Sequence, residues 1–221
     1  MPQLWRFHLS GGRLCLDLAN TVSWRAGGRP IEHLERAEDL VRWARQAGIV
    51  TVREAGRLVE AVRRDPVQGA TALARARGVR EAIYRLFAAL ADGRTPVPAD
   101  LARINKELSE ALRHIRVARR ADGSFTWEWD SKRPPVSGLL WPVARSAADV
   151  LTSDDLGRLK KCPSADCGWI FLDTTRNGTR RWCAMTVCGN RAKARRHYAG
   201  RRRMRSRRTP GRSRVSGRSS T

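Results

Sequence analysis

Four cysteines in the last third of the chain have the types and spacing of metal ligands. Cys162 and Cys167 form one C-x4-C pair, and fifteen residues later Cys183 and Cys188 form a second. Two such pairs match a structural zinc site, in which four thiolates complete a closed tetrahedron. Two disulfides or an iron–sulfur cluster are the alternatives. The first residues lack the apolar run of a secretory signal, so we expect a reducing compartment and one structural Zn²⁺.

Positive charge is concentrated in the same part of the chain. The sequence has 44 Lys and Arg against 21 Asp and Glu, a net charge of +23. From Arg158 onward there are 19 basic residues and two acidic ones, Asp166 and Asp173. This polarity indicates a polyanionic partner, because Lys and Arg that neutralise phosphates release condensed counterions. No stretch approaches the ~20 apolar residues of a membrane span. Nucleic acid is therefore favoured over a membrane as the partner.

The first part of the chain has the pattern of a helical domain with a small β element. Apolar residues recur at helical spacing over residues 37–47, 52–64, 70–91, 100–115 and 139–151. Asp122-Gly123 lies between two alternating runs, which predicts a β-hairpin. We therefore predict a mainly α fold, with a mostly helical regulatory domain over residues 1–155.

Residues 156–203 are organised differently, and they predict a zinc finger. Short strands are expected at 156–161 and 168–173, on either side of the first cysteine pair, and a basic helix at 189–198. Such a helix buries little apolar area, so it needs the metal at its start and an anion along its face. Residues 204–221 contain Pro, Gly, Ser and many Arg but no acid, which predicts a disordered basic tail.

A family resemblance rests on two stretches of the sequence. The first is KKCPSADCGWIFLDTTRNGTRRWCAMTVCGNRAKARRHY, which closely resembles the CGNR zinc finger, named for the motif that stands here as Cys188-Gly189-Asn190-Arg191. The second is GGRLCLDLANTV, which resembles the start of the N-terminal domain usually joined to this finger. That domain is mostly α-helical and is described as a putative stress-induced transcription regulator. The resemblance implies a bacterial, DNA-binding, zinc-dependent regulator, in which Cys15 adds no metal chemistry.

Basic residues of the finger and tail are the candidates for contact with nucleic acid. Phosphate contact is favoured over a merely solvated face, because the basic helix has no acidic partners nearby. Asn190 could read adenine or cap the helix, and the cap is favoured. Trp169 and Trp182 could stack on bases but are expected to pack over the metal. The candidate residues are Arg176, Arg180, Arg181, Asn190, Arg191, Lys193, Arg195, Arg196, Arg201 and Arg202.

One polar cluster in the helical domain could line a pocket for a small-molecule effector. The segment LCLDLANTVSW has a helical pattern, with an apolar face that includes Val22 and a polar face opposite to it. The polar face consists of Asp17, Asn20, Thr21 and Trp24. A pocket there would suit a ligand. The favoured alternative is a set of hydrogen bonds that fixes this helix to the hairpin.

Three functions fit these features. The favoured one is a transcriptional regulator that binds duplex DNA in the cytoplasm, at the nucleoid, because a basic helix suits the major groove. An RNA-binding or ribosome-associated protein would use the same surface, although the deep, narrow groove of duplex RNA excludes a helix. An enzyme with its site in the helical domain is least favoured. The sequence has no phosphate loop, dinucleotide fingerprint or nucleophile elbow. The sequence leaves the oligomeric state open.

Overall fold

The computed structural model describes residues 6–129 and 135–207, and for residues 202–207 it describes the backbone alone. The chain forms two compact units, Met1–Cys183 (unit 1) and Ala184–Thr221 (unit 2). The described residues contain seven α-helices and three two-stranded antiparallel sheets. The predicted mainly α fold is confirmed.

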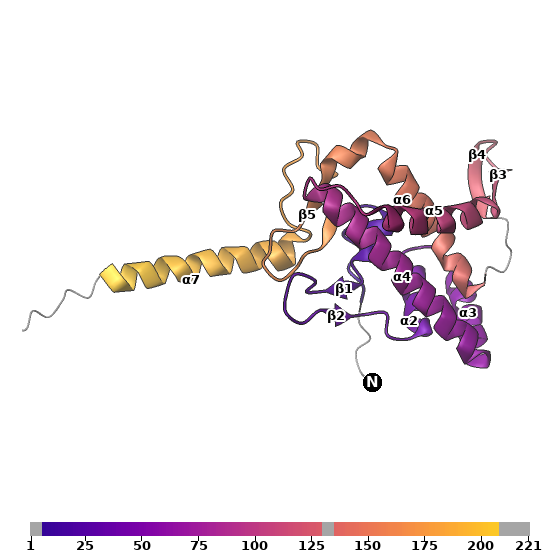
Figure 1. Cartoon of the computed structure of the whole chain (residues 1–221), viewed down its shortest axis with the longest axis horizontal. Coiled ribbons are helices and arrows are strands. Elements are labelled where there is room, and N and C mark those ends of the chain that lie inside the picture. The colour runs from indigo at the N-terminus through magenta and orange to yellow at the C-terminus, as the bar shows by residue number, and fades with distance from the viewer. Residues whose placement is uncertain (1–5, 130–134, 208–221) are drawn as a thin grey trace, which may run out of the picture. The chain divides into compact units, whose positions relative to one another are not determined.

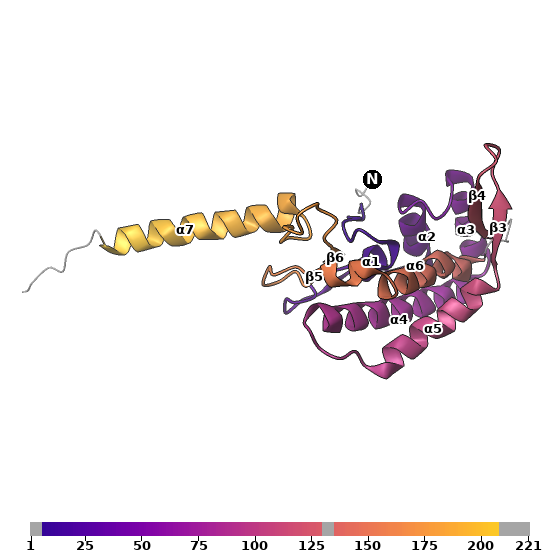
Figure 2. The same ribbon diagram turned by 90° about the horizontal axis from the view of Figure 1, so that it is seen from above.

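Helices form most of unit 1 (Figures 1 and 2). The five helices that the apolar spacing predicted are all present. Helix α4 begins at Pro66 rather than at residue 70. The reason is that Asp65 accepts the Gln68 amide at 2.9 Å as the N-cap, and proline fits the first helical position. The elements are α1 (Leu14–Ala19), α2 (Ala37–Gln46), α3 (Val52–Arg64), α4 (Pro66–Ala91), α5 (Pro98–Leu112) and α6 (Trp141–Leu151), with 3₁₀ turns η1 (Val136–Leu140) and η2 (Asp154–Arg158).

Helix α4 lies at the centre of the core of unit 1. Its residues Ile83 and Phe87 are fully buried, and α1, α2, α3 and α5 all pack against it. Two strands of the predicted finger, β5 (Leu159–Lys161) and β6 (Ile170–Leu172), also contact α4. Leu159, Ile170 and Leu172 belong to the same hydrophobic cluster as the helices. The first half of the finger therefore shares the core of the helical part.

Two further hairpins complete unit 1. The predicted one is present, with β3 (Ile115–Arg119) paired to β4 (Phe125–Trp129). Its turn contains Gly123 at a φ of 84°, as a three-residue hairpin loop requires. The second is short, with β1 (Val22–Ser23) paired to β2 (Ile31–Glu32). Strand β2 lies beside α4, because the Glu32 carboxylate accepts hydrogen bonds from Arg80 of that helix.

The first helix is shorter than the sequence pattern predicted. Helix α1 ends at Ala19 and Val22 lies in β1, so the prediction of a helix that continues through Val22 and Trp24 is wrong. Trp24 has a φ of 58°, in the left-handed region that bulky residues rarely adopt. The chain turns after α1, and this turn places Asn20 against β6.

Unit 2 consists of a π-helical turn, η3 (Met185–Gly189), and the basic helix α7 (Asn190–Arg207). Helix α7 continues beyond Tyr198, the predicted end of the basic helix. The predicted tail overlaps α7 at residues 204–207, and residues 208–221 lie outside the described part of the chain. Nine of the 18 residues of α7 are Arg or Lys, and none is acidic.

Candidate metal centre and nucleic-acid interface

The four cysteines predicted as ligands come together in the fold. The Sγ atoms of Cys162, Cys167, Cys183 and Cys188 all lie within 4.8 Å of one another, and the four residues are buried. A regular tetrahedron with Zn–S bonds of about 2.3 Å has S–S edges of about 3.8 Å. The sulfurs of Cys167 and Cys183 are 3.5 Å apart, near that edge and far beyond the roughly 2.05 Å of a disulfide. The set fits one structural Zn²⁺ in a closed thiolate shell.

The hairpin of β5 and β6 holds the first cysteine pair at its tip. The Cys162 amide donates to the Trp169 carbonyl at 2.7 Å, which closes the loop between the strands. Inside the loop, the Cys167 amide donates to the Ser164 carbonyl at 2.9 Å. Gly168 has a φ of 67°, a conformation that glycine adopts without strain. Backbone hydrogen bonds within the loop thus position two of the four ligands.

The surroundings of the cysteine thiols shift their pKa values in different directions. Hydrogen bonds from the thiols of Cys167 and Cys183 lower the pKa of the Cys162 thiol. This favours loss of a proton at the cluster, which metal binding requires. Burial raises the pKa of the Cys15 thiol to about 12, so that residue stays protonated in the core. Cys15 lies outside the cluster, as expected.

Asn20 fastens β6 to the end of α1. Its Nδ2 donates to the Ile170 carbonyl at 2.8 Å, and its Oδ1 accepts the Ile170 amide at 3.1 Å. Asn20 is 3 % exposed and Ile170 is fully buried, so water is excluded from both bonds. The neighbouring Trp169 donates from its Nε1 to the Val22 carbonyl at 2.7 Å. Trp169 is therefore held against the turn that follows α1, while its packing over the metal stays a prediction.

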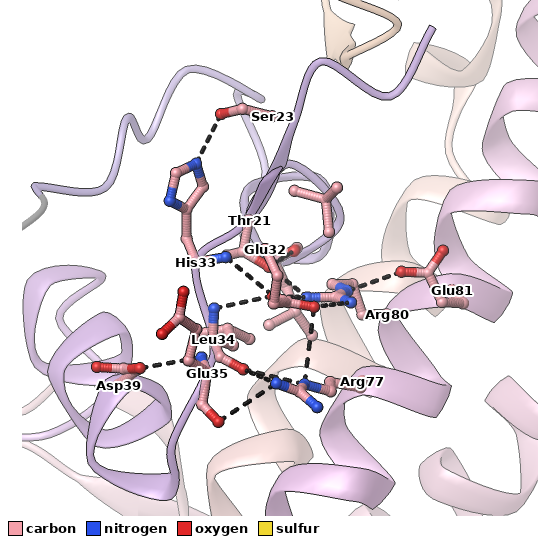
Figure 3. A network of polar contacts seen from close by, with 12 residues as sticks. Thr21, Ser23, Glu32, His33, Leu34, Glu35, Asp39, Arg77, Arg80 and Glu81 are labelled. Carbon is pink, nitrogen blue, oxygen red and sulfur yellow. Dashed lines mark hydrogen bonds and ion pairs between the residues drawn. The ribbon is translucent and has the colours of Figure 1, made fainter. Parts of the chain in front are cut away.

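Ion pairs around Arg80 support the same region (Figure 3). Arg80 is 4 % exposed, and its guanidinium donates to the Glu32 carboxylate through two bonds of 2.6 and 2.7 Å. Its Nε also donates to Glu81 at 2.9 Å. Burial acts to raise the pKa of the Glu32 carboxyl, but the Arg80 hydrogen bonds outweigh it and hold this pKa below its usual value. The paired charges tie β2 to α4.

Arg25 connects this network to the cysteine loop. Its guanidinium donates to Glu81 at 2.8 and 2.9 Å and lies 4.0 Å from the centre of the Tyr84 ring. The backbone amide of Arg25 donates to the Cys167 carbonyl at 3.1 Å, and the Tyr84 hydroxyl donates to the Gly168 carbonyl at 3.0 Å. Groups held by α4 therefore bind two successive carbonyls of the loop that carries the first cysteine pair.

Asp173 organises the chain that follows β6. Its carboxylate accepts the Lys160 ammonium at 2.7 Å, the Thr175 amide at 3.0 Å and the Arg180 amide at 2.8 Å. Burial opposes ionisation, but these hydrogen bonds prevail and hold the pKa of the Asp173 carboxyl far below its usual range. Asp173 therefore has a structural role, with bonds to backbone amides and to the side chain of Lys160.

The Arg180 side chain is engaged inside unit 1. Its guanidinium donates to the carbonyls of Ser10 at 2.7 Å, Leu172 at 3.3 Å and, through a short bond, Cys183. It also lies 4.3 Å from the centre of the Phe171 ring. These contacts occupy the donors that a phosphate would need. We therefore correct the assignment of Arg180 as a phosphate contact, because its guanidinium instead joins separate segments of unit 1 through hydrogen bonds to their carbonyls.

A backbone hydrogen bond and close packing account for Cys188 and Gly189, the first half of the CGNR motif. The Cys188 amide donates to the Ala184 carbonyl at 3.0 Å, which sets the ligand on the turn η3. Gly189 is buried, and a Cβ there would lie 2.3 Å from the sulfur of Met185. A larger residue would displace that side chain.

The second half of the motif supports the same turn. The Asn190 Nδ2 donates to the Thr186 carbonyl at 3.1 Å, within the turn η3. A helix N-cap would instead accept a backbone amide through its side-chain oxygen, so the capping role stays a prediction. The Arg191 Nη2 lies 3.5 Å from the Cys188 sulfur and is placed to donate an N–H···S bond. Such a bond orients a ligand from outside the metal shell. Arg191 therefore helps to orient the Cys188 ligand.

The remaining basic candidates face solvent. Arg176 and Arg181 are exposed on the finger loop, and Arg181 lies 5.7 Å from the centre of the Trp182 ring. The exposed candidates in α7 are Lys193, Arg195, Arg196 and Arg201, while the side chain of Arg202 lies outside the described part.

Internal contacts occupy the cluster considered as an effector pocket. Asp17 accepts the Gly11 amide at 2.7 Å, and the Thr21 hydroxyl donates to the Leu18 carbonyl at 2.8 Å. Burial raises the pKa of the Asp17 carboxyl to about 6. With both ends of the Asn20 amide engaged as well, the geometry favours the interpretation as fixing hydrogen bonds. Of these residues, Asn20 fixes α1 to β6 rather than to the β3–β4 hairpin.

The sequence analysis missed three residues that position the site, namely Arg80, Tyr84 and Lys160. Arg80 had a signal, because it follows Ala76 and precedes Ile83 at the spacing of the buried face of α4. A charged residue at such a position indicates a buried ion pair. For Tyr84 and Lys160 the sequence contains no such signal, since their partners include backbone carbonyls of loops elsewhere in the chain.

Comparison with known families follows the same division of the sequence. A family model named ABATE, described as putative stress-induced transcription regulator, matches residues 12–154. A second model, the CGNR zinc finger, matches residues 158–208. Comparison with curated proteins gives no match. Among the described residues, none of the helices combines the length and apolar character that a bilayer span needs. Because the first match covers more than half of the chain, this protein belongs to the ABATE family and carries a CGNR zinc finger with a site for one structural Zn²⁺.

Proposed function

We propose that the protein is a non-catalytic transcriptional regulator that binds duplex DNA through α7 and the finger loop. The observation that carries this proposal is the charge of α7, nine basic residues in 18 with no acid. All side chains from Lys193 to Ala199 are exposed, so apolar packing does not stabilise this stretch. Like charges three and four residues apart destabilise a helix. A row of phosphates would remove that repulsion.

The dimensions of α7 favour duplex DNA over duplex RNA. A helix with its side chains is about 10–12 Å wide, and the major groove of B-DNA is about 12 Å wide. Eighteen residues span about 27 Å, most of one turn of the duplex. The major groove of duplex RNA is too deep and narrow for such a helix. The family description adds support for a stress-related role in transcription, which would place the protein at the nucleoid in the cytoplasm.

Two of the basic candidate residues make contacts within the protein, so fewer candidates remain for contact with phosphate. Arg180 and Arg191 already have partners near the cysteines. We assign phosphate contact to the candidates whose side chains are exposed to solvent, which are Arg176, Arg181, Lys193, Arg195, Arg196 and Arg201.

The salt dependence of DNA affinity tests the proposal. For the full zinc-loaded chain, the logarithm of the binding constant should fall linearly with the logarithm of salt concentration, at about −0.9 per phosphate neutralised. Lys193→Ala and Arg196→Ala should each reduce that slope by about 0.9. Arg63→Ala, an exposed arginine at the end of α3, is the matched control and should leave the slope unchanged.

Two results would contradict the proposal. One is a DNA affinity that ignores salt, or that stays at the wild-type value in both α7 variants. The other is duplex RNA of the same sequence that competes as well as DNA, which would favour the RNA-binding alternative.

A further inference from the structure

The β3–β4 hairpin presents large apolar side chains to solvent. Val117, Phe125 and Trp127 are 57, 70 and 58 % exposed. Val117 is the cross-strand partner of Trp127, and Phe125 follows the same alternation, so the three lie on one face of the hairpin. Figures 1 and 2 show the hairpin at the periphery of unit 1, beyond the end of α5. A contiguous exposed apolar face of this kind indicates an interaction surface.

Contacts with α6 hold the base of this hairpin in place. The ring of Trp129 lies 6.1 Å from that of Trp141, on which His114 stacks at 4.0 Å. The guanidinium of Arg145 lies 4.6 Å from the centre of the Trp127 ring. Since an isolated two-stranded hairpin is marginally stable in water, these contacts explain why it keeps a fixed position.

Strand β4 also has an open edge. Within the described residues the sheet has two strands, β3 and β4. The Arg120 amide donates to the Ser124 carbonyl at 2.8 Å, which makes this first pair a hydrogen-bonded one. Because bonded and non-bonded pairs alternate in an antiparallel ladder, the N–H and C=O groups of Phe125, Trp127 and Trp129 point away from β3. These groups can accept another strand.

We propose that β4 pairs antiparallel with β4 of a second copy of this chain, about a two-fold axis at Trp127. In this register the two Trp127 residues face each other, and each Phe125 faces Trp129 of the other copy. All three aromatic pairs then lie on one face of a four-stranded sheet, where cross-strand aromatic pairs stabilise it. The outward backbone groups supply about six hydrogen bonds.

Charge favours a second copy at the β4 edge over other partners and over the β3 edge. Strand β4 has no basic residue and one acidic residue, Glu128, so it does not attract nucleic acid. In the proposed register Glu128 faces Thr126, whose hydroxyl can donate to it, and no like charges are opposed. Strand β3 carries Arg116 and Arg119, and basic residues on an edge strand hinder pairing.

The size of the contact sets its strength. An aromatic side chain buries about 150–250 Å², so the exposed parts of Phe125 and Trp127 in two copies supply roughly 400–700 Å². Stable interfaces bury about 1,200 Å² or more. The dimer is therefore reversible and concentration-dependent.

Sedimentation velocity of the full zinc-loaded chain over a concentration series tests the proposal. The mass should rise from 24.8 kDa toward twice that value. Trp127→Asp should keep the protein at 24.8 kDa, because two carboxylates would meet at the axis. Val117→Asp is the matched control, equally exposed and on the same face but on β3, and should still dimerise. Zinc content and far-ultraviolet circular dichroism check that both variants fold.

A charge pair at one position tests the register. Thr126→Glu places a carboxylate opposite Glu128 of the other copy and should abolish the dimer, while Thr126→Arg places a cation there and should retain it. Within one chain, the reverse preference holds, since Arg120 donates to Thr126 at 3.0 Å. A wild-type chain that stays monomeric up to its solubility limit overturns the proposal. So does a dimer that persists in both Trp127→Asp and Thr126→Glu.

Discussion

Replacing Asn20 with alanine should lower the free energy of unfolding of unit 1 by about 2–6 kcal/mol. The amide makes two hydrogen bonds to the backbone of Ile170, which is fully buried. Alanine leaves the N–H and C=O of Ile170 without these partners, and each unsatisfied buried group costs about 1–3 kcal/mol. Even the lower bound corresponds to a fall in Tm of about 4 °C or more for a unit of this size.

Urea denaturation of the zinc-loaded protein, followed by tryptophan fluorescence, measures this change. Asn105→Ala is the matched control, because Asn105 is exposed on α5 and its removal should change stability by less than about 0.5 kcal/mol. Zinc should also leave Asn20→Ala faster when a chelator is added, since β6 continues directly from the cysteine loop. A loss of stability no larger than that of the control would refute the argument from buried hydrogen bonds.

Three further predictions concern charge and metal. Because burial raises the pKa of Asp17 from 3.8 to about 6, the folded state retains its proton between those values, and ionisation weakens the fold as pH rises through this window. Asp17→Asn should therefore gain up to about 3 kcal/mol over wild type between pH 4 and 6 in urea denaturation, and a difference that stays constant with pH would contradict this. Elemental analysis should find one zinc per chain, and Cys183→Ser should lower the Tm of the helical part as well as unfold the finger, because β6 belongs to the shared core. A helical part that melts unchanged would argue against that shared core. Arg191→Ala should weaken zinc binding about 10–100-fold in a chelator competition, whereas Lys193→Ala should leave it unchanged. Equal zinc affinity in these two variants would show that the N–H···S contact has no effect.

The sequence predicted those features that local patterns determine. Helix α3 followed from its apolar spacing, and the structure adds a capping box of Thr51 and Glu54 at its start. Both features act within a few residues. The four cysteines were identifiable because zinc restricts both the residue type and the spacing of its ligands. The β3–β4 hairpin followed from the turn residues Asp122-Gly123.

Features that depend on distant backbone could not be predicted in this way. Arg180 was expected to be open to phosphate, but its partner Ser10 is 170 residues away in the sequence. Asn20 was placed on the polar face of a helix, yet it bonds Ile170 across 150 residues. Any residue offers the same carbonyl and amide as a partner, so the sequence carries no sign of these contacts. Helix α1 ends at Ala19 and Val22 lies in a strand, against the apolar periodicity of the segment.

The sharing of one core by the helices and β6 limits how such proteins can be recombined. A gene fusion made between residues 154 and 158 would respect the two sequence families. It would nevertheless strip Leu159, Ile170 and Leu172 of their apolar neighbours and separate Asn20 from its strand. We expect a transplanted finger to fold well only on a host with a matching turn after its first helix. New regulators of this type should therefore arise by paired substitutions in the core that the helices share with β5 and β6, more readily than by exchange of a whole finger.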